Sequence, residues 1–127
     1  MTPEVSQAIE GIRSSYPDAT VIVEEDGDGG VFAILETVNL GDRYVNPETW
    51  IGFQITYQYP NADVYPHFVR SDLARVDGRP LGEGTATASF QKRNAIQCSR
   101  KSNQLNPSVD TAVLKLAKVL EWLRKHD

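Results

Sequence analysis

The chain is poor in the residues that most often carry chemistry: it has one cysteine, Cys98, and two histidines among 127 residues. A single cysteine excludes an internal disulfide, and the N-terminus lacks a signal peptide pattern, so we expect a cytoplasmic protein. No apolar run approaches the length needed to cross a bilayer. With a formal net charge of −4, the chain lacks the overall basic character of nucleic-acid binders. We therefore expect neither a nucleic-acid nor a membrane partner.

The N-terminal region carries the pattern of an amphipathic helix. Thr2 to Glu4 is typical of a helix start, with a hydroxyl cap followed by proline and an acidic residue. Apolar residues from Val5 to Tyr16 recur at the spacing of one buried helical face. Pro17 disfavours helical backbone at the residue before it, so we expect the helix to end there.

Runs rich in β-branched and aromatic residues then predict an antiparallel meander. The four expected strands are Thr20–Glu24, Val31–Leu40, Trp50–Tyr59 and a short one beginning at His67–Val69. Residues 25–30 form the turn of the first hairpin. Asp26 and Asp28 alternate there as calcium ligands do, but the further ligands and closing glutamate of an EF-hand are missing. We interpret this turn as solvated.

The last third of the chain predicts irregular structure followed by a helix. Residues 70–84 indicate a surface loop, and Thr85–Gln91 fits either a strand or a pinned loop. Asn106 as cap and Pro107 in the first turn predict a helix start. Its apolar face comprises Val109, Ala112, Val113, Leu116, Leu120 and Leu123, and Arg124, Lys125 and His126 close it. We therefore expect one α+β domain over residues 1–127: helix, four-stranded meander, irregular segment, helix.

Cys98 lies in a basic window of this irregular segment. Between Gly84 and Val109 there are four lysines and arginines and no acidic residue. Positive charge favours the thiolate form of a cysteine, which is the nucleophile, provided that the sulfur is exposed. The alternative is that Cys98 is a small buried hydrophobic residue, as lone cysteines often are.

Several of these features together resemble the ubiquitin-conjugating enzyme (UBC) fold. The third strand runs into Tyr59-Pro60 and then Pro66, which is similar to a recurring signature of that family. Cys98 lies nine positions before Pro107, close to the family's interval between its active-site cysteine and the next helix. The runs Ser99–Asn103 and Val119–Leu123 look like those of small bacterial UBC-like proteins. The resemblance covers most of the chain.

The resemblance implies an enzyme that carries a ubiquitin-like protein as a thioester and transfers it to an acceptor, without metal or cofactor. The implied partners are a ubiquitin-like protein, an activating-enzyme homologue and, in many such operons, a metal-dependent deubiquitinase. The residues assigned to this mechanism are Cys98 as nucleophile, Asn94 and Asn103 as donors to the oxyanion, and Arg93, Arg100 and Lys101 as thiolate-stabilising or partner-binding cations.

Two other interpretations stay open. The family's His-Pro-Asn motif is absent upstream of Cys98, which favours a catalytically inactive binding module, similar to RWD and UEV relatives, for a ubiquitin-like protein or an activating enzyme. The chain could also be an unrelated α+β protein in which Cys98 belongs to the core.

Overall fold

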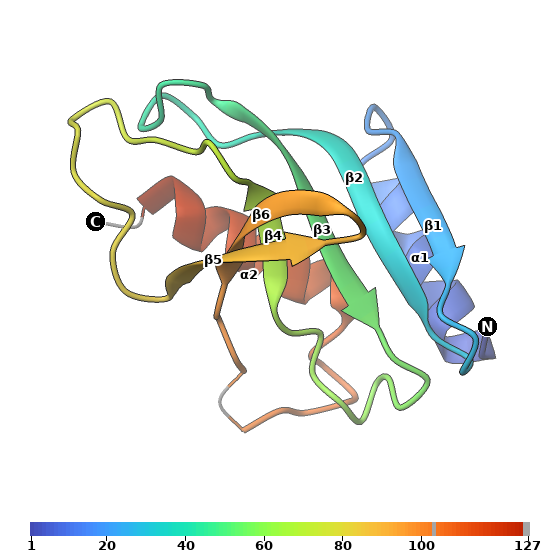
Figure 1. Ribbon diagram of the computed structural model, residues 1–127. Coiled ribbons are helices and arrows are strands. Elements are labelled where there is room, and N and C mark those ends of the chain that lie inside the picture. Colours follow the sequence, from blue (N-terminus) through green and yellow to red (C-terminus); the bar gives the residue numbers. More distant parts are fainter. Residues whose placement is uncertain (103, 126–127) are drawn as a thin grey trace.

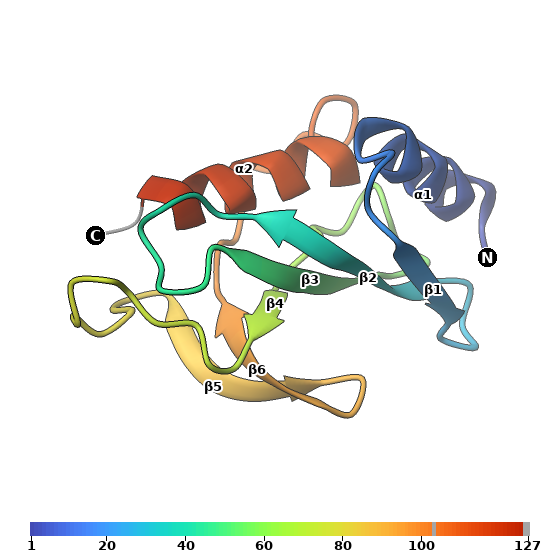
Figure 2. The same cartoon turned by 90° about the horizontal axis from the view of Figure 1, so that it is seen from above.

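A computed structural model describes residues 1–102 and 104–125, which form two helices and one six-stranded antiparallel sheet. The elements are α1 (Pro3–Ser15), β1 (Val21–Glu25), β2 (Val31–Asn39), β3 (Glu48–Ile55), β4 (His67–Arg70), β5 (Thr85–Phe90), β6 (Arg93–Cys98) and α2 (Ala112–Lys125). The strand order is β1-β2-β3-β4-β6-β5. Both helices lie on the same face of the sheet (Figures 1 and 2). We call this the helix face and the other the open face.

The α+β class is confirmed, but the prediction of a four-stranded meander with an irregular segment around Cys98 is wrong. Residues 85–98 form a hairpin, β5–β6, whose turn residues Gln91 and Lys92 both have positive φ. β6 inserts between β4 and β5. The sequence leaves Thr85–Gln91 open between a strand and a pinned loop, because most side chains of β5 contact water and lack an apolar periodicity. Strand β6 is the element that the sequence analysis does not predict.

Helix α1 follows its sequence pattern. The Thr2 hydroxyl accepts a hydrogen bond from the Val5 backbone N–H at 3.1 Å, which satisfies one of the orphan donors of the first turn. Its predicted apolar stripe is buried, with members Val5, Ala8, Ile9 and Ile12. The helix ends at Ser15, next to Tyr16 and Pro17, as the proline rule requires.

Helix α2 begins later than predicted. Asn106 caps only a local turn, in which its side-chain oxygen accepts from the Ser108 backbone N–H at 3.1 Å. Thr111 is the residue that caps the helix, since its hydroxyl accepts from the Leu114 N–H at 3.2 Å. Val109, expected on the buried face, is 54% exposed because it precedes the helix. The predicted closing residue His126 lies outside the described residues.

The core forms between α1, α2 and the helix face of the sheet. From α2 it contains Ala112, Leu116, Val119, Leu120 and Leu123. Alternate residues of the strands meet them, with Ile51, Phe53 and Ile55 of β3 fully enclosed. Each buried side chain of this size contributes roughly 1.5–3 kcal/mol through removal of apolar surface from water. This packing fixes α2 across the sheet.

On the open face, the β5–β6 hairpin folds back over the middle of the sheet. Phe90 stacks on Phe68 of β4 with ring centroids 4.7 Å apart, and on Trp50 of β3 at 6.5 Å. Gly52 makes this approach possible, because a Cβ there would lie 2.6 Å from the Phe90 ring. The hairpin tip reaches β1, where Gln91 donates to the Glu24 carboxylate at 3.0 Å. The sheet is thereby strongly curled (Figure 2).

We expect Gly52→Ala to lower the free energy of unfolding by about 1–3 kcal/mol, because the added methyl group overlaps the Phe90 ring and forces it from β3. Chemical denaturation measures the change. In a double-mutant cycle, Gly52→Ala should cost much less in a Phe90→Ala background, where the ring is gone. Equal costs in the two backgrounds would mean that Phe90 does not rest on Gly52.

Candidate functional site

Cys98 is the last residue of β6, and its side chain lies on the helix face of the sheet. It pairs with His67 of β4 and is 0% exposed. Burial raises the pKa of its thiol to about 12, and no neighbouring charge offsets this effect. The condition of an exposed sulfur is therefore not met, and the alternative of a small buried residue describes Cys98 in this structure. In this structure Cys98 is a protonated member of the hydrophobic core.

The predicted companions of Cys98 are engaged elsewhere. The Arg93 guanidinium pairs with the Glu36 carboxylate at 2.7 Å and lies 5.1 Å from the centre of the Trp50 ring, on the open face. Arg100 lies over Trp122 at 5.2 Å. Lys101 and Asn94 are exposed, and Asn103 lies outside the described residues. No cation offsets the effect of burial on the pKa of the Cys98 thiol.

A polar network lies beside the core, where the segment after β6 passes over the start of α2. The Lys115 ammonium, 6% exposed, donates to the Asp63 carboxylate at 3.0 Å and to the Ser102 hydroxyl at 2.9 Å. The Ser102 backbone N–H donates to Asp63 at 2.7 Å. Burial alone would raise the pKa of Asp63, but the hydrogen bonds from Ser102 and Lys115 outweigh it and lower that pKa. The network holds Ser102 against α2.

His67 is enclosed between this network and Cys98. It is 0% exposed, its ring lies 5.1 Å from that of Phe53, and neither ring nitrogen has a hydrogen-bond partner among the described residues. Burial lowers the pKa of the imidazole to about 3, and the charge of Lys115 acts in the same direction. His67 is therefore neutral at physiological pH. A proton on it would be an unpaired buried charge.

Sequence reasoning missed Asp63, His67 and Lys115 as a structural group. One signal was available: Lys115 falls on the apolar stripe of α2, between Ala112 and Leu116, where a charged residue requires a buried partner. Nothing in the sequence indicates that the partner is Asp63, which comes from the turn between β3 and β4.

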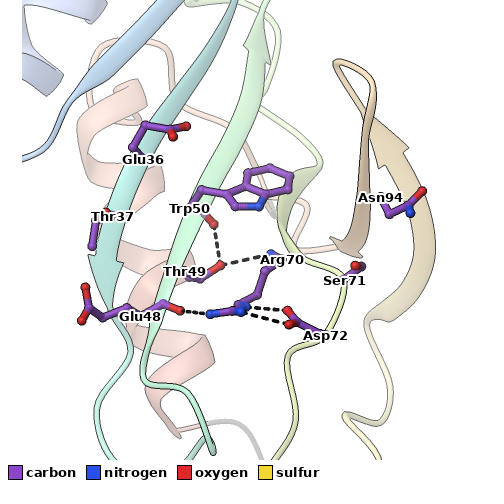
Figure 3. A pocket seen from close by; sticks show the side chains of 9 residues that line it. All are labelled: Glu36, Thr37, Glu48, Thr49, Trp50, Arg70, Ser71, Asp72 and Asn94. Carbon is purple, nitrogen blue, oxygen red and sulfur yellow. Dashed lines mark hydrogen bonds and ion pairs between the residues drawn. The ribbon is translucent and has the colours of Figure 1, made fainter.

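The open face carries a hollow of about 480 Å³ beside the hairpin. It is lined by Glu36, Thr37, Glu48, Thr49, Trp50, Arg70, Ser71, Asp72 and Asn94 (Figure 3). The lining comes from β2, β3, the end of β4 and β6, so residues distant in the sequence converge there. The indole of Trp50 is its only aromatic group.

Arg70 organises one wall of this hollow. Its guanidinium makes two hydrogen bonds to the Asp72 carboxylate and donates to the Glu48 carbonyl oxygen at 2.9 Å (Figure 3). This pairing lowers the pKa of Asp72. The Thr49 hydroxyl accepts from the Arg70 backbone N–H at 3.0 Å. The hollow thus presents hydrogen-bonding groups and one ring face, which suits binding of a polar surface.

Within residues 1–102 and 104–125, no three or more His, Cys, Asp or Glu side chains cluster in a way that could hold a metal ion. Neither described helix is long and apolar enough to span a membrane.

Comparisons of the chain with protein-family models, with curated proteins and with solved structures found no match.

We expect the native thiol of Cys98 to react with a disulfide reagent such as DTNB at least about a hundredfold more slowly at pH 8 than in the denatured chain. A thiol pKa near 12 leaves little thiolate at that pH, and the side chain is enclosed. Absorbance measures the released thiolate with and without guanidinium chloride. Rapid reaction of the folded protein would place the sulfur at the surface.

We expect His67 to make the protein sensitive to mild acid. Because its folded pKa is about 3 and its unfolded pKa about 6.5, the unfolded chain binds the extra proton, and stability falls as pH drops below about 6.5. Between pH 6 and 5 this contribution is about 1 kcal/mol. Urea titrations at pH 6 and pH 5 measure the free energy of unfolding. In His67→Leu its decrease between the two pH values should be smaller by this amount than in the wild type. An unchanged loss in the variant would assign the acid sensitivity to other groups.

Proposed function

We propose that this chain is a binding module of the UBC-like class, which recognises a ubiquitin-like protein or its activating enzyme and does not carry a thioester. The observation behind the proposal is the complete burial of Cys98 in a strand of the central sheet. A carrier needs its sulfur at the surface, where a large acyl donor can reach it, and needs a thiolate near neutral pH. Neither condition holds at Cys98.

The resemblance to the UBC class rests on the order of elements and on one turn. A helix precedes the sheet, and the segment from Tyr59 to Pro66 follows β3. The Tyr59-Pro60 and Tyr65-Pro66 peptide bonds are both cis. The Tyr59 hydroxyl accepts a hydrogen bond from the Ala112 backbone N–H at 3.0 Å, so this turn supports the first turn of α2. The absence of the His-Pro-Asn motif agrees with a module that has no thioester to stabilise.

The surface we assign to partner binding is the hollow on the open face. It combines the partly exposed Trp50 with a set of exposed polar side chains, as interface centres and rims commonly do. Its wall contains two preformed ion pairs, Arg70 with Asp72 and Arg93 with Glu36. A preformed wall loses little side-chain entropy when a partner docks.

The carrier function predicted from the resemblance is the competing proposal. It requires a rearrangement that brings the Sγ of Cys98 to the surface, such as separation of the end of β6 from its pairing partners His67 and Thr85. Such a rearrangement breaks the register of the sheet and opens the core around His67.

Mass spectrometry separates the two proposals. The protein and Cys98→Ser are incubated with ATP, an activating-enzyme homologue and a ubiquitin-like protein from an operon of the bacterial type, with and without reductant. The positive control is a conjugating enzyme known to accept the same ubiquitin-like protein. A thioester on that enzyme establishes that the components are active. We expect no adduct on this chain. A reductant-sensitive adduct on Cys98 that is lost in the variant would overturn the binding-module proposal.

Affinity measurements test the hollow. Ser71→Arg adds a bulky cation at its exposed rim, whereas Ser14→Arg makes the same change on an exposed position of α1, on the opposite side of the sheet. We expect Ser71→Arg to weaken binding of the ubiquitin-like protein or activating enzyme at least tenfold by calorimetry, and Ser14→Arg to change it less than twofold. Equal affinities for the two variants would show that the hollow is not part of the interface.

A further inference from the structure

The two edges of the sheet are protected to very different degrees. Edge strands present unpaired backbone groups, and proteins commonly shield them with charges, proline, bulges or covering segments. Strand β1 is shielded by charges, since it ends in Glu24 and Glu25 and the N-terminal ammonium pairs with Glu25 at 2.9 Å. Arg13 of α1 also donates to the Val21 carbonyl oxygen at 3.2 Å.

Strand β5, at the other edge, has none of these protections. Its residues, Thr85–Phe90, include no charge and no proline, and its pairing with β6 is continuous without a bulge. The strand lies at the end of the strand order, so one side of its backbone has no neighbouring strand (Figure 2). Ala86, Thr87 and Ser89 are exposed. Strand β5 is therefore the unshielded edge of the sheet.

The hairpin register identifies which backbone groups of β5 point outward. The Ser99 N–H donates to the Gly84 carbonyl oxygen at 2.8 Å, so this pair occupies a hydrogen-bonded position of the ladder between the two strands. Because hydrogen-bonded and non-bonded positions alternate, Thr85, Thr87 and Ser89 direct their N–H and C=O groups away from β6. Among the described residues, no hydrogen bond from outside the hairpin reaches those backbone groups.

The side chains of β5 match those of a second, antiparallel copy of the same strand. With a two-fold axis at Thr87, Thr87 faces Thr87 of the second copy, and Thr85 faces Ser89. On the other side of the strand pair, Ala86 faces Ala88. Hydroxyl residues thus meet hydroxyl residues, and Thr–Thr and Thr–Ser pairs across two strands are stabilising. A second copy supplies this matching pattern by its own sequence.

The charges beside β5 suit the same register. It places the exposed Glu83, which precedes β5, opposite Gln91 of the second copy and next to its exposed Lys92. Opposite charges across a strand pair are stabilising. Two further charges lie nearby on other strands: Lys101 follows β6, and Glu24 of β1 accepts a hydrogen bond from Gln91. They are opposite in sign, so each end of the strand pair is balanced.

We propose that two copies of this chain pair through β5 in antiparallel orientation, with Thr87 on the two-fold axis, and join their sheets into one. The pairing provides partners for the outward backbone groups of Thr85, Thr87 and Ser89. Because it uses the unshielded edge of each copy, the assembly closes as a dimer. The paired strands are short, so the dimer is of the weak class that dissociates on dilution. This inference goes beyond the proposed function and does not depend on it.

Sedimentation velocity across a dilution series tests for the dimer. Thr87→Pro removes an outward-pointing donor from each copy without touching the ladder to β6, and should raise the dimer dissociation constant at least about tenfold. The matched variant Thr87→Val keeps the donor and should change this constant less than about threefold. Dimers of equal stability in Thr87→Pro and the wild type would place the interface elsewhere and overturn the proposal.

Cysteine cross-linking tests the register and does not require the proline variant to fold. Directly opposed residues of a hydrogen-bonded strand pair have Cα atoms about 5.5 Å apart, which is within reach of a disulfide. Under mild oxidation, Thr87→Cys should form a linked dimer at least about tenfold faster than Ser14→Cys, whose position on α1 is also exposed. The native Cys98 is 0% exposed and gives no background. Equal rates for the two variants would contradict the proposed interface.

A mixture of two single-cysteine variants fixes the register further. We expect Thr85→Cys to cross-link with Ser89→Cys, and neither variant to cross-link with itself at a comparable rate, because only the mixed pair lies directly opposite. Mass spectrometry of the linked species distinguishes the pairs. Cross-linking of each variant mainly with itself would overturn this register.

Another occupant of the edge would give a different result. Monomers at every concentration up to about 1 mM would overturn the proposal, because any weaker association has little stability. If the Thr87 amide proton of such a monomer became protected from solvent exchange only after addition of the ubiquitin-like protein or activating enzyme, that partner would occupy β5 in place of a second copy. A thioester on Cys98 would refute the proposed function alone, because the dimer measurements use neither ATP nor an activating enzyme.

Discussion

The packing of α2 against one face of the sheet is the constraint on which the remaining structure depends. Its apolar stripe needs a continuous apolar partner, and β6 contributes to that partner by inserting between β4 and β5. Once β6 is a central strand, its alternate side chains must face α2. Cys98 is therefore enclosed because of its position in the strand. Its chemistry follows from this placement, since a thiol without water or a nearby cation keeps its proton.

The basic residues near Cys98 in the sequence contact other groups and do not stabilise a thiolate. Arg93 points to the opposite face of the sheet, where Glu36 and Trp50 hold it, and Arg100 covers Trp122 of α2. Both side chains fasten the hairpin and the segment after it to neighbouring elements. Neighbours in a strand alternate between faces, so nearness in sequence does not imply nearness in space.

A polar network beside the core joins two irregular segments to α2. Asp63 and Ser102 come from segments outside helices and strands, and Lys115 reaches them from the stripe of α2. Satisfied hydrogen bonds there compensate for the desolvation of the charges and specify one arrangement of the two segments. His67 lies next to this network without a partner of its own, so it is the group whose protonation opposes the folded state. The hollow that we assign to partner binding is, by contrast, on the open face.

The sequence by itself determined the elements with strong local signals. The α1 stripe, the strands of the meander and the apolar residues of α2 from Ala112 onward are confirmed, because periodic burial leaves a direct trace in the order of residues. Only the tertiary structure decided the hairpin, the start of α2 and the environment of Cys98. Strand β5 consists mostly of small residues, and it is a strand because it pairs with β6. Thr111 caps α2 in place of Asn106, at the point where the Tyr59 hydroxyl accepts from the Ala112 N–H. Whether a thiol reacts depends on burial and distant charges, which are properties of the assembled sheet.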